Sequence, residues 1–155
     1  MRQMMAAAAF MGILALANGA SAQTDPSVGT WKLNVAKSNY NGGSVPKSST
    51  VVVENAGQGI KVTGTTVLGD GSTRTVNYTA NYDGKDAAVT GTPDYNTVSM
   101  TRSGSTIKGV RRRGGKRAQT FTTVISADGK TRTTTTTGTD AMGKKVNTVQ
   151  VYDRQ

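Results

Sequence analysis

Five cations stand within seven residues around a Gly-Gly pair, and this run is the densest group of chemically active side chains in the sequence. It reads Arg111-Arg112-Arg113-Gly114-Gly115-Lys116-Arg117. A Gly-Gly pair favours a tight hairpin turn, and arginines beside exposed backbone amides bind phosphate, sulfate or carboxylate groups. The same cations could instead protect strand ends from edge-to-edge association. The run therefore predicts either an anion-binding hairpin or a solvated turn.

The overall charge also favours anionic partners. The chain has 19 Lys and Arg against 9 Asp and Glu, a formal net charge of +10, and such a surplus attracts anions as well as keeping a protein soluble. Nucleic acid is disfavoured as a partner, because proteins that bind RNA or single strands interleave aromatic side chains with the charge. No aromatic residue lies between Val98 and Thr120.

A second group of candidates lies on segments where apolar and polar residues alternate. Arg102 shares a predicted face with Val98 and Met100, where a cation is costly unless it is paired or meets an anionic ligand. Tyr78 and Tyr82 alternate in the same way on another segment, and their hydroxyls could orient a ligand. We expect Tyr78, Tyr82, Met100 and Arg102 to line the interior. The alternative is a structural role, with packed tyrosines and a paired arginine.

Enzymatic chemistry is disfavoured by the residue types that the sequence lacks. It has no cysteine and no histidine, and its only glutamate is Glu54. These absences remove Ser-His-Asp and Cys-His nucleophiles, imidazole bases, and zinc ligation through thiolate or imidazole. The aspartates are isolated, several of them in turn sequences, so no calcium loop is expected. We expect no catalytic residues, no metal and no cofactor.

The elements that must position these side chains are predicted to be strands joined by short turns. Asp-Gly and Gly-Gly pairs supply the positive backbone dihedrals of two-residue hairpins, and threonine and valine dominate between them. No stretch after the first 23 residues shows apolar residues at helical spacing over three turns. Strands are predicted at 30–34, 51–53, 60–68, 76–82, 87–89, 98–102, 106–112, 117–126, 131–137 and 146–152.

Sequential hairpins of this number close best as a barrel, because closure removes the exposed sheet edges. We therefore predict an all-β fold, a single antiparallel up-and-down barrel of about 8–10 strands without a helical lid. The supply of large apolar side chains is thin. The barrel should accordingly be only modestly stable, or its interior should be partly hollow and polar.

The N-terminal segment has the form of a Sec-type export signal. Arg2 supplies a positive start, residues 4–17 are almost all apolar, and Ala20-Ser21-Ala22 matches a cleavage site. The apolar run is too short to span a bilayer, and no second one follows it. We predict a removed signal peptide (1–22) and one β-barrel domain (23–155), located in the periplasm or secreted.

The start of the first predicted strand, Gly29-Thr30-Trp31-Lys32-Leu33, resembles the opening of the calycins, which include lipocalins and fatty-acid-binding proteins. Residues 25–38 resemble, more narrowly, a group of exported bacterial lipocalin-like proteins. The resemblance implies a barrel in which Trp31 closes one end beneath an arginine, with Arg102 and Arg154 as the candidates. A cation–π contact of that kind contributes about 0.5–2 kcal/mol.

Two departures limit what this resemblance implies about a ligand. Fatty-acid-binding proteins carry two helices between their first two strands, whereas residues 38–48 are too few and too rich in Gly and Pro for them. Their last strand carries Arg-x-Tyr, which holds the ligand carboxylate, and this chain has Gln150-Val151-Tyr152 there. The resemblance implies a barrel and not fatty-acid binding in that manner.

These observations together predict an exported, non-enzymatic calycin-like barrel that binds a small amphipathic or anionic ligand in its interior. The alternative is an envelope interaction protein that binds lipopolysaccharide or polysaccharide through the hairpin at 111–117. The expected partner is therefore a small hydrophobic or anionic molecule, or an anionic envelope polymer or lipid. No transmembrane segment is expected once the signal is removed.

Overall fold

The computed structural model describes residues 24–155, so the predicted signal peptide at 1–22 lies outside the described residues. Ten antiparallel strands follow one another along the chain, and each is hydrogen-bonded to the next. The first strand also pairs with the last, which closes the sheet into a barrel. The prediction of an all-β, up-and-down barrel without a helical lid is confirmed.

The strands are β1 (Gly29–Leu33), β2 (Ser48–Ala56), β3 (Gly59–Val67), β4 (Thr73–Asn81), β5 (Ala87–Thr90), β6 (Thr97–Ser103), β7 (Thr106–Arg113), β8 (Lys116–Ile125), β9 (Thr131–Thr139) and β10 (Lys145–Arg154). A single 3-10 turn, η1 (Val35–Lys37), follows β1 and leads into the loop before β2. Among residues 24–155 there is no helix with the length and apolar character needed to cross a bilayer.

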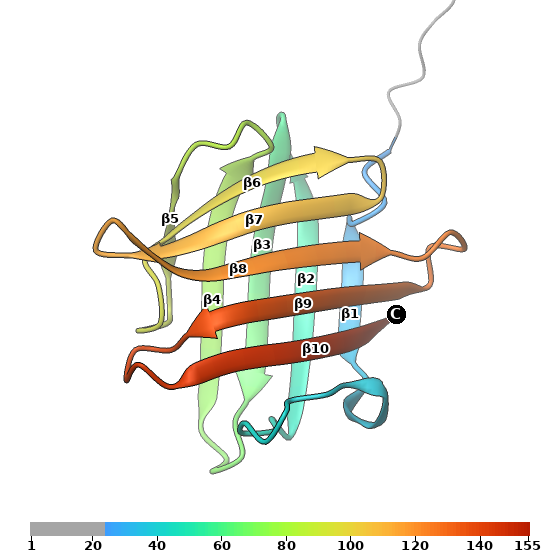
Figure 1. Cartoon of the computed structure of the whole chain (residues 1–155). Helices are drawn as coiled ribbons and strands as arrows, with labels where there is room; N and C mark the ends of the chain where they lie inside the picture. The colour runs from blue at the N-terminus through green and yellow to red at the C-terminus, as the bar shows by residue number, and fades with distance from the viewer. Residues whose placement is uncertain (1–23) are drawn as a thin grey trace, which may run out of the picture.

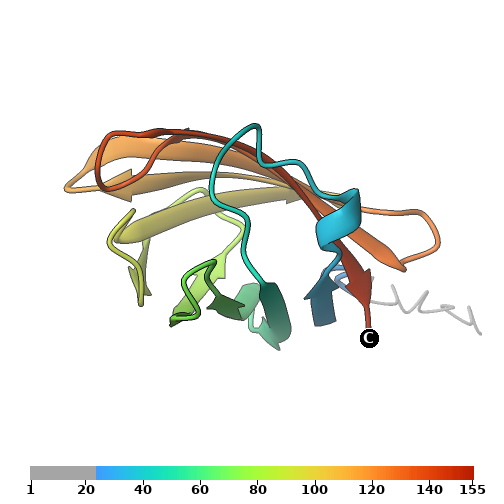
Figure 2. The same cartoon turned by 90° about the horizontal axis from the view of Figure 1, so that it is seen from below.

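The barrel is flattened into two layers. Strands β6 to β10 form one layer and cross over β1 to β4 in the other (Figure 1). The view from below separates the two layers (Figure 2). Short β5 joins them, pairing with β4 at two positions and with β6 at two others.

The two ends of the barrel are built from different turns. One end, which we call the closed end, carries residues 24–28, the turns at 57–58, 82–86, 104–105 and 126–130, and the last residue of the chain. The far end carries the segment 34–47 and the turns at 68–72, 91–96, 114–115 and 140–144.

The apolar core occupies part of the interior only. Its buried members are Trp31, Leu33, Val53, Ile60, Val62, Ala80, Val89, Val98, Met100, Ile107, Phe121, Ile125 and Tyr152. Polar side chains are buried beside them, and the hydroxyls of Thr123 and Thr134 share a hydrogen bond of 2.8 Å. A thin apolar core alongside buried polar groups fits the expectation of a partly hollow and polar interior.

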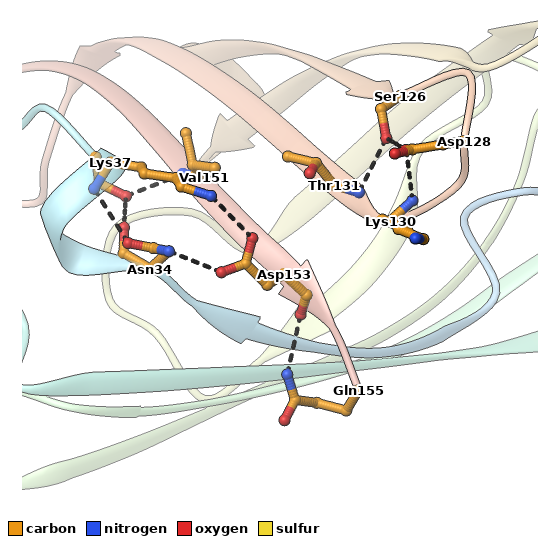
Figure 3. A network of polar contacts seen from close by, with 10 residues as sticks. Asn34, Lys37, Ser126, Asp128, Lys130, Thr131, Val151, Asp153 and Gln155 are labelled. Carbon is orange, nitrogen blue, oxygen red and sulfur yellow. Dashed lines mark hydrogen bonds and ion pairs between the residues drawn. The ribbon is translucent and has the colours of Figure 1, made fainter.

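The turn before β9 sets the position of that strand (Figure 3). The Asp128 carboxylate accepts hydrogen bonds from the Ser126 hydroxyl at 2.6 Å and the Lys130 amide at 3.0 Å. The Thr131 amide then donates to the Ser126 hydroxyl at 2.9 Å. This turn joins β8 to β9, where Arg132 lies opposite Ile125. On the other side of β9, Arg132 lies directly opposite Tyr152 of β10.

Candidate functional site

A cavity of about 180 Å³ lies inside the barrel. Side chains from both layers line it: Ser49, Val51, Val62, Gly64, Thr66, Val76, Tyr78, Tyr95, Arg111, Arg132, Thr134, Gln150 and Tyr152. Three valines make an apolar wall, and three phenols, two guanidiniums, hydroxyls and an amide make the remainder. The cavity therefore combines an apolar surface with charge and hydrogen-bonding groups, as ligand sites do.

Arg132 is the central group of this site. Its side chain points inward from β9, and the residue is only 8% exposed. Neither its Nε nor its Nη1 finds an acceptor among residues 24–155. Burial lowers the pKa of the Arg132 guanidinium, but an arginine still carries its proton at neutral pH. Arg132 is therefore a buried cation whose hydrogen-bonding capacity is not met by the protein.

Arg111 brings a second positive charge to the cavity. Its guanidinium carbon lies 4.9 Å from the Tyr95 ring centroid and 4.5 Å from the Phe121 ring centroid. Its Nη1 donates to Gln119 Oε1 at 3.1 Å. These contacts fix Arg111 in place, while no carboxylate belongs to the lining among the described residues. The cavity is electropositive without an internal counter-charge.

Two tyrosines of the cavity, Tyr78 and Tyr152, stay neutral near neutral pH. Burial raises the pKa of Tyr78 and of Tyr152 above the usual value of 10.0. Neutral phenols both donate and accept hydrogen bonds. The titration of these groups therefore leaves the charge of the cavity unchanged near neutral pH.

The cations of the predicted anion-binding hairpin do not all lie at its tip. Strand β7 extends through Arg113, so the turn itself is only Gly114-Gly115. Successive strand residues point to opposite faces, and Arg111 accordingly faces the cavity. Arg112 points outward and donates to Asp86 at 2.6 Å and to Ser99 at 3.1 Å.

The remaining cations of the hairpin lie at the far end. Arg113 donates to the main-chain oxygen of Asp94 at 2.7 Å, whereas Lys116 and Arg117 are exposed. The structure thus does not bring Arg111, Arg112, Arg113, Lys116 and Arg117 together at one tip. The physical reason is the two-residue period of the strand, which separates neighbouring side chains.

Of the four residues expected to line the interior, Tyr78 lies in the cavity wall. Met100 is 1% exposed and packs in the apolar core instead. Tyr82 and Arg102 lie at the closed end, where both approach Asp25: the Tyr82 hydroxyl donates to Asp25 Oδ2 at 2.6 Å, and Arg102 Nε is 3.8 Å from the same oxygen. Pairing with a carboxylate therefore satisfies Arg102 outside the cavity.

Asp25 is held ionised by this arrangement. Burial by itself raises the pKa of Asp25, but hydrogen bonds from Tyr82 and Ser27, with the charge of Arg102, together bring it below its usual value. The carboxylate thus ties the segment before β1 to the ends of β4 and β6.

Trp31 lies at the closed end, is fully buried, and donates from its indole to the main-chain oxygen of Ser27 at 2.8 Å. Arg154 is the arginine that covers it, with its guanidinium carbon 4.1 Å from the ring centroid. Arg154 also donates to the main-chain oxygens of Gly129, Val28 and Pro26. A Cβ on Gly29 would lie 2.4 Å from Arg154 Nη1, so glycine makes room for this contact.

Asp94 lies at the far end, next to the cavity residue Tyr95, and forms hydrogen bonds with several neighbouring elements. Its carboxylate accepts from Arg74 Nη1 at 3.3 Å and from the Ala141 amide at 3.0 Å. Its main-chain oxygen accepts from Arg113. One residue thereby joins the 91–96 turn to three neighbouring elements around the far end.

A second, larger hollow of about 320 Å³ lies over β6, β7 and β8. It lies beside Gly109, and the buried Phe121 ring packs directly against Gly109, in the space that a side chain there would take. It holds one cation, Lys108, and no buried polar atom that lacks a partner. Among the described residues, no cluster of three or more Asp or Glu side chains could hold a metal ion.

Sequence reasoning missed Arg132 and assigned Arg111 to the exterior. Arg132 precedes a run of threonines at 133–137, in which both faces of the strand look alike, so the pattern does not reveal an inner face. The alternation of β7 was a usable signal for Arg111, because Arg111 lies four positions after the apolar Ile107 and therefore shares its face.

Comparisons with known proteins add a likeness in fold. No protein-family profile matches the sequence, and no curated protein matches it. Among solved structures, the barrel resembles zebrafish ileal bile acid-binding protein, which was solved in complex with cholic acid. The two share 14% sequence identity over 84% of this chain and 99% of that chain, with a TM-score of 0.49.

Proposed function

We propose that the barrel binds a small anionic molecule in its interior and that Arg132 is the group that receives the anion. The observation that carries this proposal is the buried guanidinium of Arg132, whose Nε and Nη1 have no acceptor among residues 24–155. An unpaired buried charge costs several kcal/mol in real proteins. An anion in the cavity would offset that cost and supply the missing acceptors.

The surroundings of Arg132 support the same reading. Arg111 adds a second positive charge, and the lining offers no carboxylate that could compete with a ligand. Structural arginines elsewhere in this barrel have their partners: Arg154 donates to three main-chain oxygens, and Arg112 meets Asp86. Arg132 differs from them in having a cavity where its partner would be.

We further propose that this binding takes place outside the cytoplasm, after removal of residues 1–22. Cleavage after Ala22 would keep Asp25 and Ser27, whose contacts hold the closed end together. The mature barrel would then be complete. N-terminal sequencing of the protein from the envelope fraction should give Gln23 as the first residue; an intact N-terminus would contradict export.

Native mass spectrometry tests the binding proposal. The protein and its Arg132→Met variant are purified gently from the same host compartment, and their masses are compared before and after denaturation. We expect the unaltered protein to retain a small molecule that the variant lacks. The same bound molecule in both proteins would refute a role for Arg132. If neither protein retains a molecule, a titration with acetate decides, because the proposal requires saturable binding that Arg132→Met removes.

A further inference from the structure

The size of the cavity limits what can bind beside Arg132. At about 180 Å³, it is smaller than the roughly 300–1,000 Å³ of sites that take drug-sized ligands. It is close to a cavity of about 150 Å³ that accepts one benzene molecule. A chain of sixteen carbons has nearly three times the six carbons of benzene, so it is too large to lie wholly inside this volume.

The lining also limits the chemistry of the ligand. The Arg132 guanidinium calls for an anionic group, and Tyr152 lies directly opposite it in the register of β9 and β10. Val51, Val62 and Val76 form the apolar wall, which suits a ring or a short hydrocarbon chain. Arg111 is already held by Gln119 and two aromatic rings, so a single anionic head group at Arg132 is sufficient.

On the basis of the function proposed above, we propose that the ligand is a compact monocarboxylate, with one aromatic ring or a short hydrocarbon chain as its body. The carboxylate accepts hydrogen bonds from Arg132, and the body packs against the three valines. The class comprises molecules of about nine non-hydrogen atoms, a size at which the best ligands gain the most binding energy per atom. The chain of a long-chain fatty acid is too large to lie wholly inside the cavity.

Gly64 offers a direct way to test the volume. It lies on β3 between Val51 of β2 and Val76 of β4. A Cβ at this position would meet only Val51 Cγ2, at 3.9 Å, so a larger side chain fits without displacing the backbone. Gly64→Val adds three carbons, which fill about half of the cavity. Thr63→Val is the matched control, because Thr63 is the neighbouring residue on the other face of β3 and does not line the cavity.

The experiment is isothermal titration calorimetry of the purified protein with benzoate, hexanoate, palmitate and the neutral analogue benzyl alcohol. We expect benzoate and hexanoate to bind at least about tenfold more tightly than palmitate and benzyl alcohol. Arg132→Met should weaken benzoate binding by about tenfold or more, the loss expected for a hydrogen bond to a charged group. Gly64→Val should abolish binding, and Thr63→Val should leave it unchanged. Thermal unfolding confirms that each variant is folded, and Gly64→Ala, with a smaller expected loss, replaces Gly64→Val if that variant does not fold.

The pH dependence separates a carboxylate from a phosphate head group. Benzoate is ionised throughout neutral pH, and burial raises the pKa of Tyr78 and Tyr152, so the benzoate affinity should stay constant from about pH 6 to 9. Phenyl phosphate gains charge near pH 6. Tighter binding of phenyl phosphate than of benzoate at pH 7 would overturn the assignment to carboxylates.

The possible failures are distinguishable. Palmitate binding as tightly as benzoate, with the same dependence on Arg132, would overturn the size limit and leave the proposed function intact. Benzoate and hexanoate binding that Arg132→Met does not alter would overturn the proposed function itself. No binding of either small carboxylate would overturn the ligand class.

Discussion

Replacement of Arg132 by methionine should stabilise the ligand-free barrel, which is the opposite of what a core substitution usually does. The guanidinium is buried, and its Nε and Nη1 have no acceptor among the described residues. Methionine has a similar length, no charge, and a flexible side chain that fills irregular space. The substitution therefore removes the cost of a buried charge without breaking a bond that the protein makes.

The magnitude follows from the cost of that charge. Replacing buried ionic groups by apolar residues of similar volume has stabilised proteins by about 1–4 kcal/mol. For a domain of this size, each kcal/mol shifts the melting temperature by roughly 3–5 °C. We therefore expect the melting temperature of Arg132→Met to rise by roughly 3–20 °C.

Thermal and urea unfolding of ligand-free protein measure this difference, and Arg154→Met provides the matched control. Arg154 carries the same charge, but it donates to three main-chain oxygens and covers Trp31. Its replacement should destabilise the barrel by about 2–4 kcal/mol. A destabilisation of similar size in Arg132→Met would show that Arg132 has a structural role, and the reasoning would be refuted.

Three further predictions concern the two ends of the barrel. Asp25 has a lowered pKa in the folded state, so its stabilising effect is present at neutral pH and is lost as the pH falls below about 4. Asp25→Asn should lower the free energy of unfolding by about 1–2 kcal/mol at pH 7. In urea unfolding, this variant should lose less stability on acidification than the unaltered protein. Asp94→Ala removes the contacts with Arg74 and the Ala141 amide, which hold the turn that carries the cavity residue Tyr95. Loosening this turn should raise the association and dissociation rates of benzoate severalfold with little change in affinity, as measured by NMR line shapes; unchanged rates would show that benzoate does not enter past this turn. Replacing exposed Lys116 and Arg117 with glutamine should lower the salt concentration for elution from heparin by no more than the same change at two scattered exposed lysines, Lys85 and Lys130. A much larger drop for the hairpin pair would favour the surface-binding alternative.

The fold was accessible from the sequence because its signals are local. Pairs such as Asp128-Gly129 mark the turns, and the threonine and valine segments between them have one dominant local preference. The closed end could be predicted in part. Gly29 and Trp31 indicated it, but whether Arg102 or Arg154 covers Trp31 depends on where the last strand pairs with the first. That pairing joins residues at opposite ends of the chain.

The interior site was less accessible, for a different physical reason. Thr133–Thr137 presents the same residue type on both faces of β9, so no contrast identifies which face is buried. The pairing of Arg132 with Tyr152 depends on the register between β9 and β10. The cationic run at 111–117 predicted an anion site at the exposed hairpin tip, whereas strand alternation places Arg111 in the cavity. The density of charge in the sequence therefore indicated β7 correctly, but it placed Arg111 on the outer face of the strand and not on the inner one.

The measurement that tests the central claim most directly is NMR of the arginine Nε–H groups during titration with acetate. Acetate is small enough to enter the cavity whatever the natural ligand is. We predict that the Arg132 signal shifts saturably, that Tyr152 amide shifts follow it, and that the Arg132→Met variant loses these Tyr152 shifts. Shifts confined to Arg117 at the exposed hairpin, with Arg132 unaffected, would contradict anion binding in the barrel interior.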